Sequence, residues 1–248
     1  MEILGALIAG AFIGSVLGFV GAGGAMLAVP ILIYGFGFEP SVASTAALAV
    51  VGSAALSGAS AKIKKKEIYY RDALAIWAIG LTTNIFFSTI VHRLPEDFIA
   101  VGFSLVIVFA GLSMLGSPLT TIHKRMSWPV LITISLLIGS ITGLFGIGGG
   151  FLVIPVLVLG FGTSHAIAAG TALFVIAINS ATALLGHNAL WSEVSWEIPL
   201  IMGASAVVVA QIASRIKLPI SDVLLRKIFA YLLFSVAIFT LIERIFII

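Results

Sequence analysis

The sequence predicts an all-α polytopic membrane protein made of two inverted five-segment repeats with glycine-broken or re-entrant helices. The first observation is composition: 60% of the 248 residues are hydrophobic and only 9% are charged, too few charges to cover a water-soluble domain. The second is that apolar runs of about 18 residues or more, enough to span a bilayer, recur from end to end. The third is a glycine-rich motif that occurs twice. We therefore expect residues 1–248 to form a single transmembrane domain.

Apolar runs between charged residues and Pro/Gly punctuation predict ten helical segments. They cover roughly residues 3–20, 24–38, 41–61, 70–92, 97–115, 129–145, 150–162, 165–186, 197–213 and 224–246. The first segment carries no basic residue ahead of its apolar run, so we expect a membrane helix there and not a cleaved signal peptide. The second and seventh segments are too short to cross a bilayer comfortably.

An internal repeat relates the two halves. Residues 14–48 align with residues 139–173 without a gap and share 15 identities in 35 positions. The matches include Gly18/Gly143, Gly21/Gly146, Gly23/Gly148, Gly24/Gly149, Pro30/Pro155 and the Gly-Phe-Gly triplets at 35–37 and 160–162. Glycine-rich membrane helices resemble one another by composition, but prolines and triplets that match at one constant offset favour duplication. We predict repeats over 3–115 and 129–246.

The loop charges predict how the repeats are oriented. The loop after the third segment is basic, whereas the loop after its counterpart, the eighth, holds Glu193 and Glu197 and no Lys or Arg. With the 62–71 loop in the cytoplasm, all 13 basic residues except Arg93 and Arg244 fall on the cytoplasmic side. The pattern predicts a multi-pass protein of the cell inner membrane, with inverted repeats and both termini on the outer, periplasmic side.

The glycine-rich stretches GAGGA (21–25) and GIGGG (146–150) interrupt lipid-length apolar sequence. An unpaired backbone group in hydrocarbon costs several kcal/mol, so such breaks persist only where protein or a polar cavity satisfies them. Each break starts a new helix with free N–H groups and a positive dipole end, and glycine lets a ligand approach closely. We predict two anion-binding nests that enter from opposite faces and meet near the midplane, on re-entrant hairpins or on ten short spans.

A packing role competes with binding for these glycines. Gly10, Gly14 and Gly18 recur at four-residue spacing, as do Gly139 and Gly143, and we assign those stripes to close helix packing. Consecutive glycines serve no single packing face, which favours binding for the GxGG cores.

Polar residues inside apolar segments extend the predicted site. Asn84, Asn179 and Gln211 need hydrogen-bond partners there, and they either tie helices together or line a pathway. His165 and His187, at the ends of the eighth segment, suit a proton relay or simple solvation. The predicted anion-binding residues are Gly21, Gly23, Gly24, Ala25, Thr45, Asn84, Gly146, Gly148, Gly149, Gly150, Thr171 and Asn179.

The sequence lacks the residues that several classes of function require. There is no cysteine, no HExxH or GxSxG motif and no Asp or Glu deep inside any segment, so we expect no enzyme, cofactor or metal site. A missing intramembrane carboxylate also argues for an anion as cargo. We expect a small anion and the lipid bilayer as partners, and no nucleic acid. The sequence does not decide whether the protein forms a homo-oligomer. We therefore predict a secondary transporter for a small anion. The alternatives are an anion-selective channel and a non-transporting membrane scaffold.

Two motifs carry a family resemblance. With the repeated G-x-G-G-(A/G)…P pattern, the stretch GLFGIGGGFLVIPVL and the GTAL sequence of Gly170 to Leu173, the chain resembles the TauE/SafE sulfite exporter family over nearly its whole length. The first half departs from the second, with ASTAAL near Thr45 where the second reads AAGTAL, so a strictly symmetric site is not expected. The resemblance implies transport of small sulfur-containing anions, such as sulfite or organosulfonates, across the inner membrane.

Overall fold

The computed structural model describes residues 2–22, 24–115, 127–146, 150–155, 157 and 163–216, together with 224, 227, 230, 231 and 233–239 near the C-terminus. These residues are helical or lie in turns and loops, and none of them forms a strand. Five of the helices are long and apolar enough to cross a bilayer. The predicted all-α, multi-pass architecture is confirmed.

The helices follow the predicted segments to within a few residues. They are α1 (Glu2–Val20), α2 (Gly24–Pro30), the π-helical η1 (Ile31–Gly35), α3 (Pro40–Ile63), α4 (Tyr70–Ile90), the 3₁₀ turn η2 (Val91–Arg93), α5 (Glu96–Leu115), α6 (Trp128–Phe145), α7 (Gly150–Pro155), α8 (His165–Gly186), the 3₁₀ turn η4 (Asn188–Leu190) and α9 (Glu197–Ala213). Most of the predicted segment 224–246, and the second half of 150–162, lie outside the described residues.

Prolines and glycines explain where the second segment departs from a regular helix. Pro30 has no N–H to donate within the helix, and the five residues after it adopt the wider π geometry. Gly37 then adopts a left-handed conformation, with φ of +72°. The helix expected over 24–38 therefore ends at Gly35.

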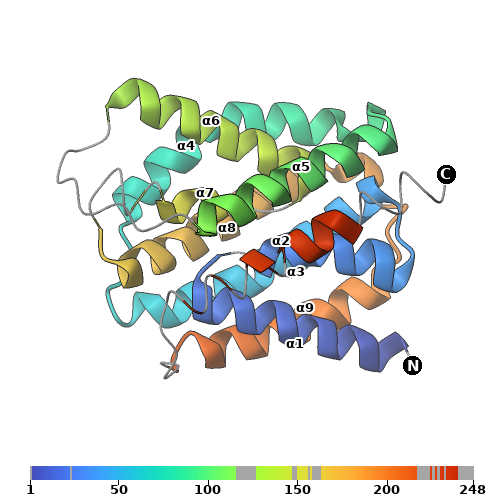
Figure 1. The fold of residues 1–248 in the computed structure, drawn as a ribbon, viewed down its shortest axis with the longest axis horizontal. Coiled ribbons are helices and arrows are strands. Elements are labelled where there is room, and N and C mark those ends of the chain that lie inside the picture. Colours follow the sequence, from blue (N-terminus) through green and yellow to red (C-terminus); the bar gives the residue numbers. More distant parts are fainter. Residues whose placement is uncertain are drawn as a thin grey trace.

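The helices α3 and α8 form the centre of the bundle and run antiparallel (Figure 1). Gly52 of α3 faces Ser180 of α8, and Gly58 faces Leu173. α1 and α9 pack along one side of this pair, and α4 and α6 pack along the other. α3 is the most deeply buried of the five candidate spans.

Small residues let the outer helices approach each other closely. A Cβ added at Gly14 of α1 would meet the backbone of Ala206 of α9, and one added at Gly139 of α6 would meet the backbone of Gly80 of α4. Lipid tails are as apolar as the side chains, so helix association depends on this kind of close van der Waals packing. The packing role predicted for these two glycine stripes is confirmed.

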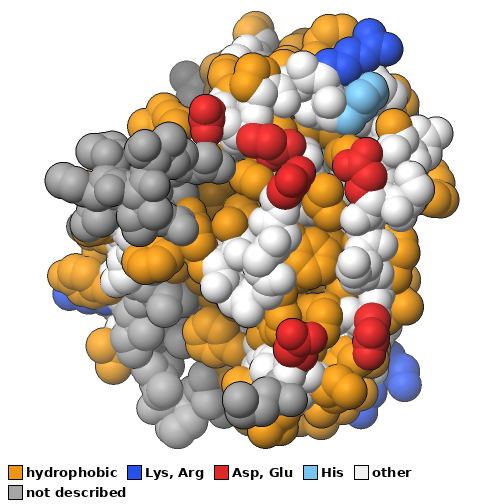
Figure 2. All heavy atoms as spheres, turned by 90° about the vertical axis from the view of Figure 1, so that its right-hand side faces the viewer, with side chains coloured by type: hydrophobic (Ala, Val, Ile, Leu, Met, Phe, Trp, Pro, Cys, Tyr) orange, Lys and Arg blue, Asp and Glu red, His pale blue; other side chains and the backbone are white. Residues whose placement is uncertain are grey.

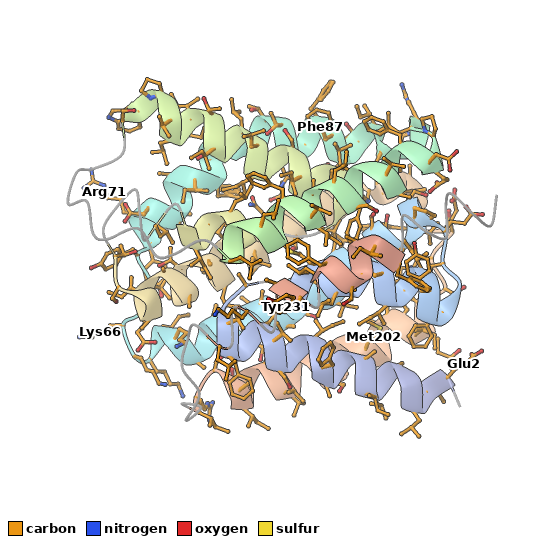
Figure 3. All side chains as sticks on the ribbon, viewed as in Figure 1. Glu2, Lys66, Arg71, Phe87, Met202 and Tyr231 are labelled. Carbon is orange, nitrogen blue, oxygen red and sulfur yellow. The ribbon has the colours of Figure 1, made fainter. Side chains whose placement is uncertain are left out.

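The two ends of the bundle differ in charge. Figure 2 shows one of them, which we call the acidic end, where carboxylate side chains gather. The residues of the acidic end are Glu2, Glu39, Glu96, Asp97, Glu193 and Glu197, with Arg93 beside them. The opposite, basic end carries Lys62, Lys64, Lys65, Lys66, Arg71 and Arg215, of which Lys66 and Arg71 are labelled in Figure 3. The 62–71 loop and the loop after α8 thus lie at opposite ends, as their charges predict.

Candidate functional site

The first glycine-rich stretch forms a tight turn between α1 and α2. α1 ends at Val20, and Gly21 follows in the left-handed region with φ of +76°. The Gly21 N–H donates to Leu17 O at 2.9 Å and closes the last turn of α1. A Cβ added at Gly24, where α2 begins, would lie 2.7 Å from Ile13 O. Glycine is required at Gly21 by its conformation and at Gly24 by the close approach of α2 to α1.

Gly146, the first residue of the second glycine-rich stretch, has the same conformation after α6 as Gly21 has after α1. Gly146 has φ of +68°, and its N–H donates to Thr142 O at 3.1 Å. Ala25 and Gly150 stand in the first turns of α2 and α7, where backbone N–H groups have no partner within the helix. Gly23, Gly148 and Gly149 lie outside the described residues.

Each glycine turn packs against a central helix of the other half of the chain. A Cβ added at Gly21 would meet Ala169 of α8, and one added at Gly146 would meet Ser44 of α3. These two contact residues, Ser44 and Ala169, are separated by the same 125-residue offset as the two glycines in the sequence alignment. The two halves therefore make equivalent contacts with each other.

The expectation that these two turns meet near the midplane is wrong. Ala169 lies at the basic end, because its neighbour Gly170 faces Lys62, whereas Ser44 lies in the first turns of α3 near the acidic end. From Ser44 to Lys62 the distance along α3 is about 27 Å, at a rise of about 1.5 Å per residue. The 19 residues of α1 cross most of the bundle before the chain turns, so α2 and η1 form a short return crossing. Sequence patterns do not report this depth.

The predicted residues Asn84 and Asn179 meet in the interior. The side chains come from α4 and α8 and are 0% and 1% exposed. Asn84 Nδ2 donates to Asn179 O at 3.1 Å and lies 3.5 Å from Asn179 Oδ1. The adjacent Ser180 faces Gly52, near the middle of α3, so this amide pair lies close to mid-depth.

Part of this amide pair has no partner. Asn84 Oδ1 is fully buried and accepts no hydrogen bond from any described residue, and the same holds for the hydroxyl of Ser180. A buried, unsatisfied polar atom costs about 1–3 kcal/mol. Buried polar atoms in folded proteins are almost always hydrogen-bonded, so this acceptor is an exception that calls for an explanation.

The two predicted threonines do not join the amide pair. Thr171 Oγ1 accepts from the N–H of Tyr69 at 3.0 Å, which ties α8 to the loop before α4 at the basic end. Thr45 Oγ1 lies 3.0 Å from Ser41 O and 2.7 Å from Nδ1 of His187. Both hydroxyls are fully buried, so they hold helix ends together in this conformation.

His187, which immediately follows the α8 span, is buried, so the solvated position that was one of its two expected environments is wrong. Its ring is 1% exposed, and its Nε2 lies 2.8 Å from Gly143 O of α6. Burial lowers the pKa of His187 to about 4, so the ring is neutral near pH 7. A carbonyl can only accept, so Nε2 carries the proton and Nδ1 accepts from Thr45. His187 also lies 125 residues after Lys62, at the same repeat offset.

A second polar cluster joins α3 to α9 near the basic end. Ser57 Oγ donates to Val207 O at 2.8 Å. With its amide oriented to match its neighbours, Gln211 donates to Ser60 Oγ at 3.0 Å and accepts from Arg215 at 2.8 Å. Gln211 was expected either to tie helices together or to line a pathway, and its observed contacts, like those of Ser57 and Ser60, are helix contacts.

One pocket opens at the acidic end. It has a volume of about 390 Å³ and is lined by Phe36, Gly37, Phe38, Glu39, Val42, Glu193 and Ser195. Two carboxylates face it, and none of the predicted anion-binding residues does. It therefore does not suit an anion. Among the residues that the structure describes, no three His, Cys, Asp or Glu side chains cluster as metal ligands would.

Both halves of the chain contain a glycine turn and a close helix contact at small residues. Comparison with known sequences shows to which family the chain belongs. Residues 6–240 match the family described as Sulfite exporter TauE/SafE. The chain belongs to the TauE/SafE family. No solved structure matches it significantly.

Two curated proteins are similar to this chain over most of its length. The chain is 26% identical over 241 residues to the "Probable membrane transporter protein" of Xylella fastidiosa (strain 9a5c), covering 94% of this chain and 92% of the other. It is 27% identical over 218 residues to the "Probable membrane transporter protein YunE" of Bacillus subtilis (strain 168), covering 77% and 79%. Family membership and the five candidate spans identify a multi-pass membrane protein of a transporter family.

Proposed function

We propose that this TauE/SafE protein is a secondary transporter that moves a small anion, such as sulfite or an organosulfonate, across the inner membrane. The observation that carries the proposal is the amide pair Asn84–Asn179, fully buried near mid-depth with an unsatisfied oxygen. An unsatisfied buried oxygen is costly, and a role in a path for the anion accounts for its presence. The buried polar side chains of the described residues are hydroxyls, amides and His187, without a carboxylate, which favours an anion over a cation.

The repeats 3–115 and 129–246 form the two halves of this transporter, inverted relative to each other. Equivalent contacts support this arrangement: α1 packs on α9 as α6 packs on α4, and Gly21 packs on Ala169 as Gly146 packs on Ser44. Repeats that enter from opposite sides are the common basis of alternating access, in which one part of the fold rocks against the other.

Each glycine turn serves one side of the membrane in this proposal. Backbone amides of Gly21 to Ala25 bind the anion near the basic end, and those of Gly146 to Gly150 bind it near the acidic end. The free N–H groups at the starts of α2 and α7 and the missing side chains support this role. The anion passes between the two turns beside Asn84 and Asn179, and Thr45 and Thr171 contact it when their helix ends separate.

The basic end faces the cytoplasm in this proposal, and the acidic end faces the periplasm. The positive-inside rule supports this orientation, because the cytoplasmic loops of membrane proteins carry an excess of Lys and Arg. Both termini then lie on the periplasmic side.

A ligand screen on the purified protein tests the proposal. The melting temperature is measured with sulfite, sulfate, thiosulfate, sulfoacetate, taurine and small carboxylates. We expect sulfite or a sulfonate to raise it, because a ligand that binds only the folded state stabilises that state. The shift should disappear in Gly24→Val, where a side chain would meet α1, and persist in Gly35→Ala, whose added Cβ makes only an ordinary contact 3.8 Å from Ile31. No shift with any anion would contradict anion transport.

A further inference from the structure

A three-way junction at the acidic end holds three helix ends together. His187, after α8, bridges Thr45 in the first turns of α3 and Gly143 in the last turn of α6. Gly143 is three residues before the left-handed Gly146, which packs on Ser44. In the proposed transport cycle, a path at the acidic end opens when these helix ends separate, and separation exposes His187 to water.

The hydrogen bonds of this junction can accommodate either charge state of the ring. In the neutral ring, the single Thr45 hydroxyl proton goes to His187 Nδ1, so the hydroxyl cannot also donate to Ser41 O. In the imidazolium, both ring nitrogens donate, and the Thr45 proton turns to Ser41 O. Burial of the ring penalises the charge and keeps the closed form neutral.

The other repeat has a lysine in the equivalent place. Lys62 precedes His187 by the repeat offset of 125 residues, and its Cβ faces Gly170, the equivalent of Thr45. Lys62 Nζ pairs with Glu67 Oε2 at 2.9 Å. This ion pair joins the last turn of α3 to the loop that follows it, on which Gly170 of α8 packs, whereas the acidic end has the histidine junction in the equivalent place.

Other charged groups surround the junction. They are Glu39 before α3, His92 and Arg93 in η2 after α4, Glu96 and Asp97 at the start of α5, and Glu193 after η4, while the described part of α6 contributes none. Glu96 accepts from the Ser41 N–H at 2.9 Å, and His92 opposes a positive charge on His187. The surrounding carboxylates attract protons and cations to this end once it opens.

We propose that the Thr45–His187–Gly143 junction is an acid-opened latch on the outer gate of the transporter. When the helix ends separate, His187 enters water and takes a proton from the outer compartment, and closure releases that proton again. Acid outside therefore favours the outward-open state. This inference rests on the proposed transport function and on its orientation, and it assigns His187 a positioning role and no contact with the anion.

Cysteine labelling tests the latch directly, because the chain contains no cysteine of its own. Ser88 of α4 is fully buried, and its side chain meets Gly186 beside His187. A Ser88→Cys reporter is treated with a membrane-impermeant maleimide from outside. Its rate is divided by that of Ser192→Cys, an exposed control in the loop after η4, to cancel the pH dependence of the thiol itself. The relative rate should rise by up to about 30-fold between pH 8 and pH 5, given a His187 pKa of about 4 closed and 6.5 open.

The variant His187→Gln should keep the hydrogen bonds of the neutral ring but lose this pH dependence. An equal rise in His187→Gln, or a flat profile in the parent, would overturn the latch. If His187→Gln does not fold, Thr45→Val provides the second arm: it should label faster at pH 8 and still respond to acid, and unchanged labelling would contradict the proposal. Labelling reports opening and not flux, so a reporter that titrates in a protein that moves no sulfite would refute transport and leave the latch standing.

Discussion

Replacing the left-handed glycines by alanine separates two costs in stability: that of a positive φ for a residue with a Cβ, and that of the contacts the new Cβ makes. Gly21, Gly146 and Gly37 all have positive φ, at +76°, +68° and +72°. An alanine at Gly37 would meet nothing within 4 Å, whereas at Gly21 it would meet Ala169 and at Gly146 the backbone of Ser44. Gly37→Ala is therefore a matched control that pays only the conformational cost.

The magnitudes follow from these contacts. The left-handed conformation costs a non-glycine residue about 1–2 kcal/mol, which is the expected loss for Gly37→Ala. Forcing a methyl group against a packed helix adds about 1–3 kcal/mol, so Gly21→Ala and Gly146→Ala should each lose about 2–5 kcal/mol. Reversible unfolding in mixed micelles, followed by circular dichroism, measures the three free energies. Equal losses in all three variants would refute the close packing of the turns on α3 and α8.

Three further outcomes are expected. Because burial depresses the pKa of His187 to about 4, the folded protein should lose stability as pH falls below 6.5, by about 2 kcal/mol at pH 5, and His187→Gln should lack this loss in a pH series of unfolding curves. Asn84→Leu removes one hydrogen bond and one unsatisfied oxygen together, so the unfolding free energy should change by less than about 1 kcal/mol. Sulfite flux through this variant should be lost. Intact flux would show that the amide pair is a helix contact only. Gly14→Ala and Gly139→Ala each place a methyl group on a partner backbone, so each should lower the unfolding free energy by a similar amount, about 1–3 kcal/mol. Gly35→Ala is the control variant. Unequal losses of unfolding free energy at Gly14 and Gly139 would count against the repeat.

The sequence was enough to predict the helices, because lipid-length apolar runs and Pro/Gly boundaries are local signals. The π-helical turn after Pro30 was not predicted, since proline marks a disturbance without fixing how the following residues resolve it. The packing of Gly14 and Gly139 was also predictable, because in lipid small residues at four-residue spacing have few other uses.

The site was predicted only in part, because its depth depends on how helices cross. From the sequence, Asn84 and Asn179 could be recognised as amides that need hydrogen-bond partners. In the structure Asn84 donates a hydrogen bond to Asn179. The two glycine turns were expected at the midplane, but α1 runs its full length before Gly21, which places the turns near opposite ends. His187 looked like a residue at a helix end, and its burial arises from helices far away in the sequence.

Counterflow of radiolabelled sulfite into proteoliposomes tests anion transport most directly. Vesicles loaded with unlabelled sulfite, and containing the purified protein, should accumulate the label transiently above equilibrium, saturably and at carrier rates, and sulfoacetate in the same assay shows whether sulfonates are accepted. Vesicles that show no protein-dependent uptake of any small oxyanion would contradict the account, and single-channel currents without counterflow would favour a channel.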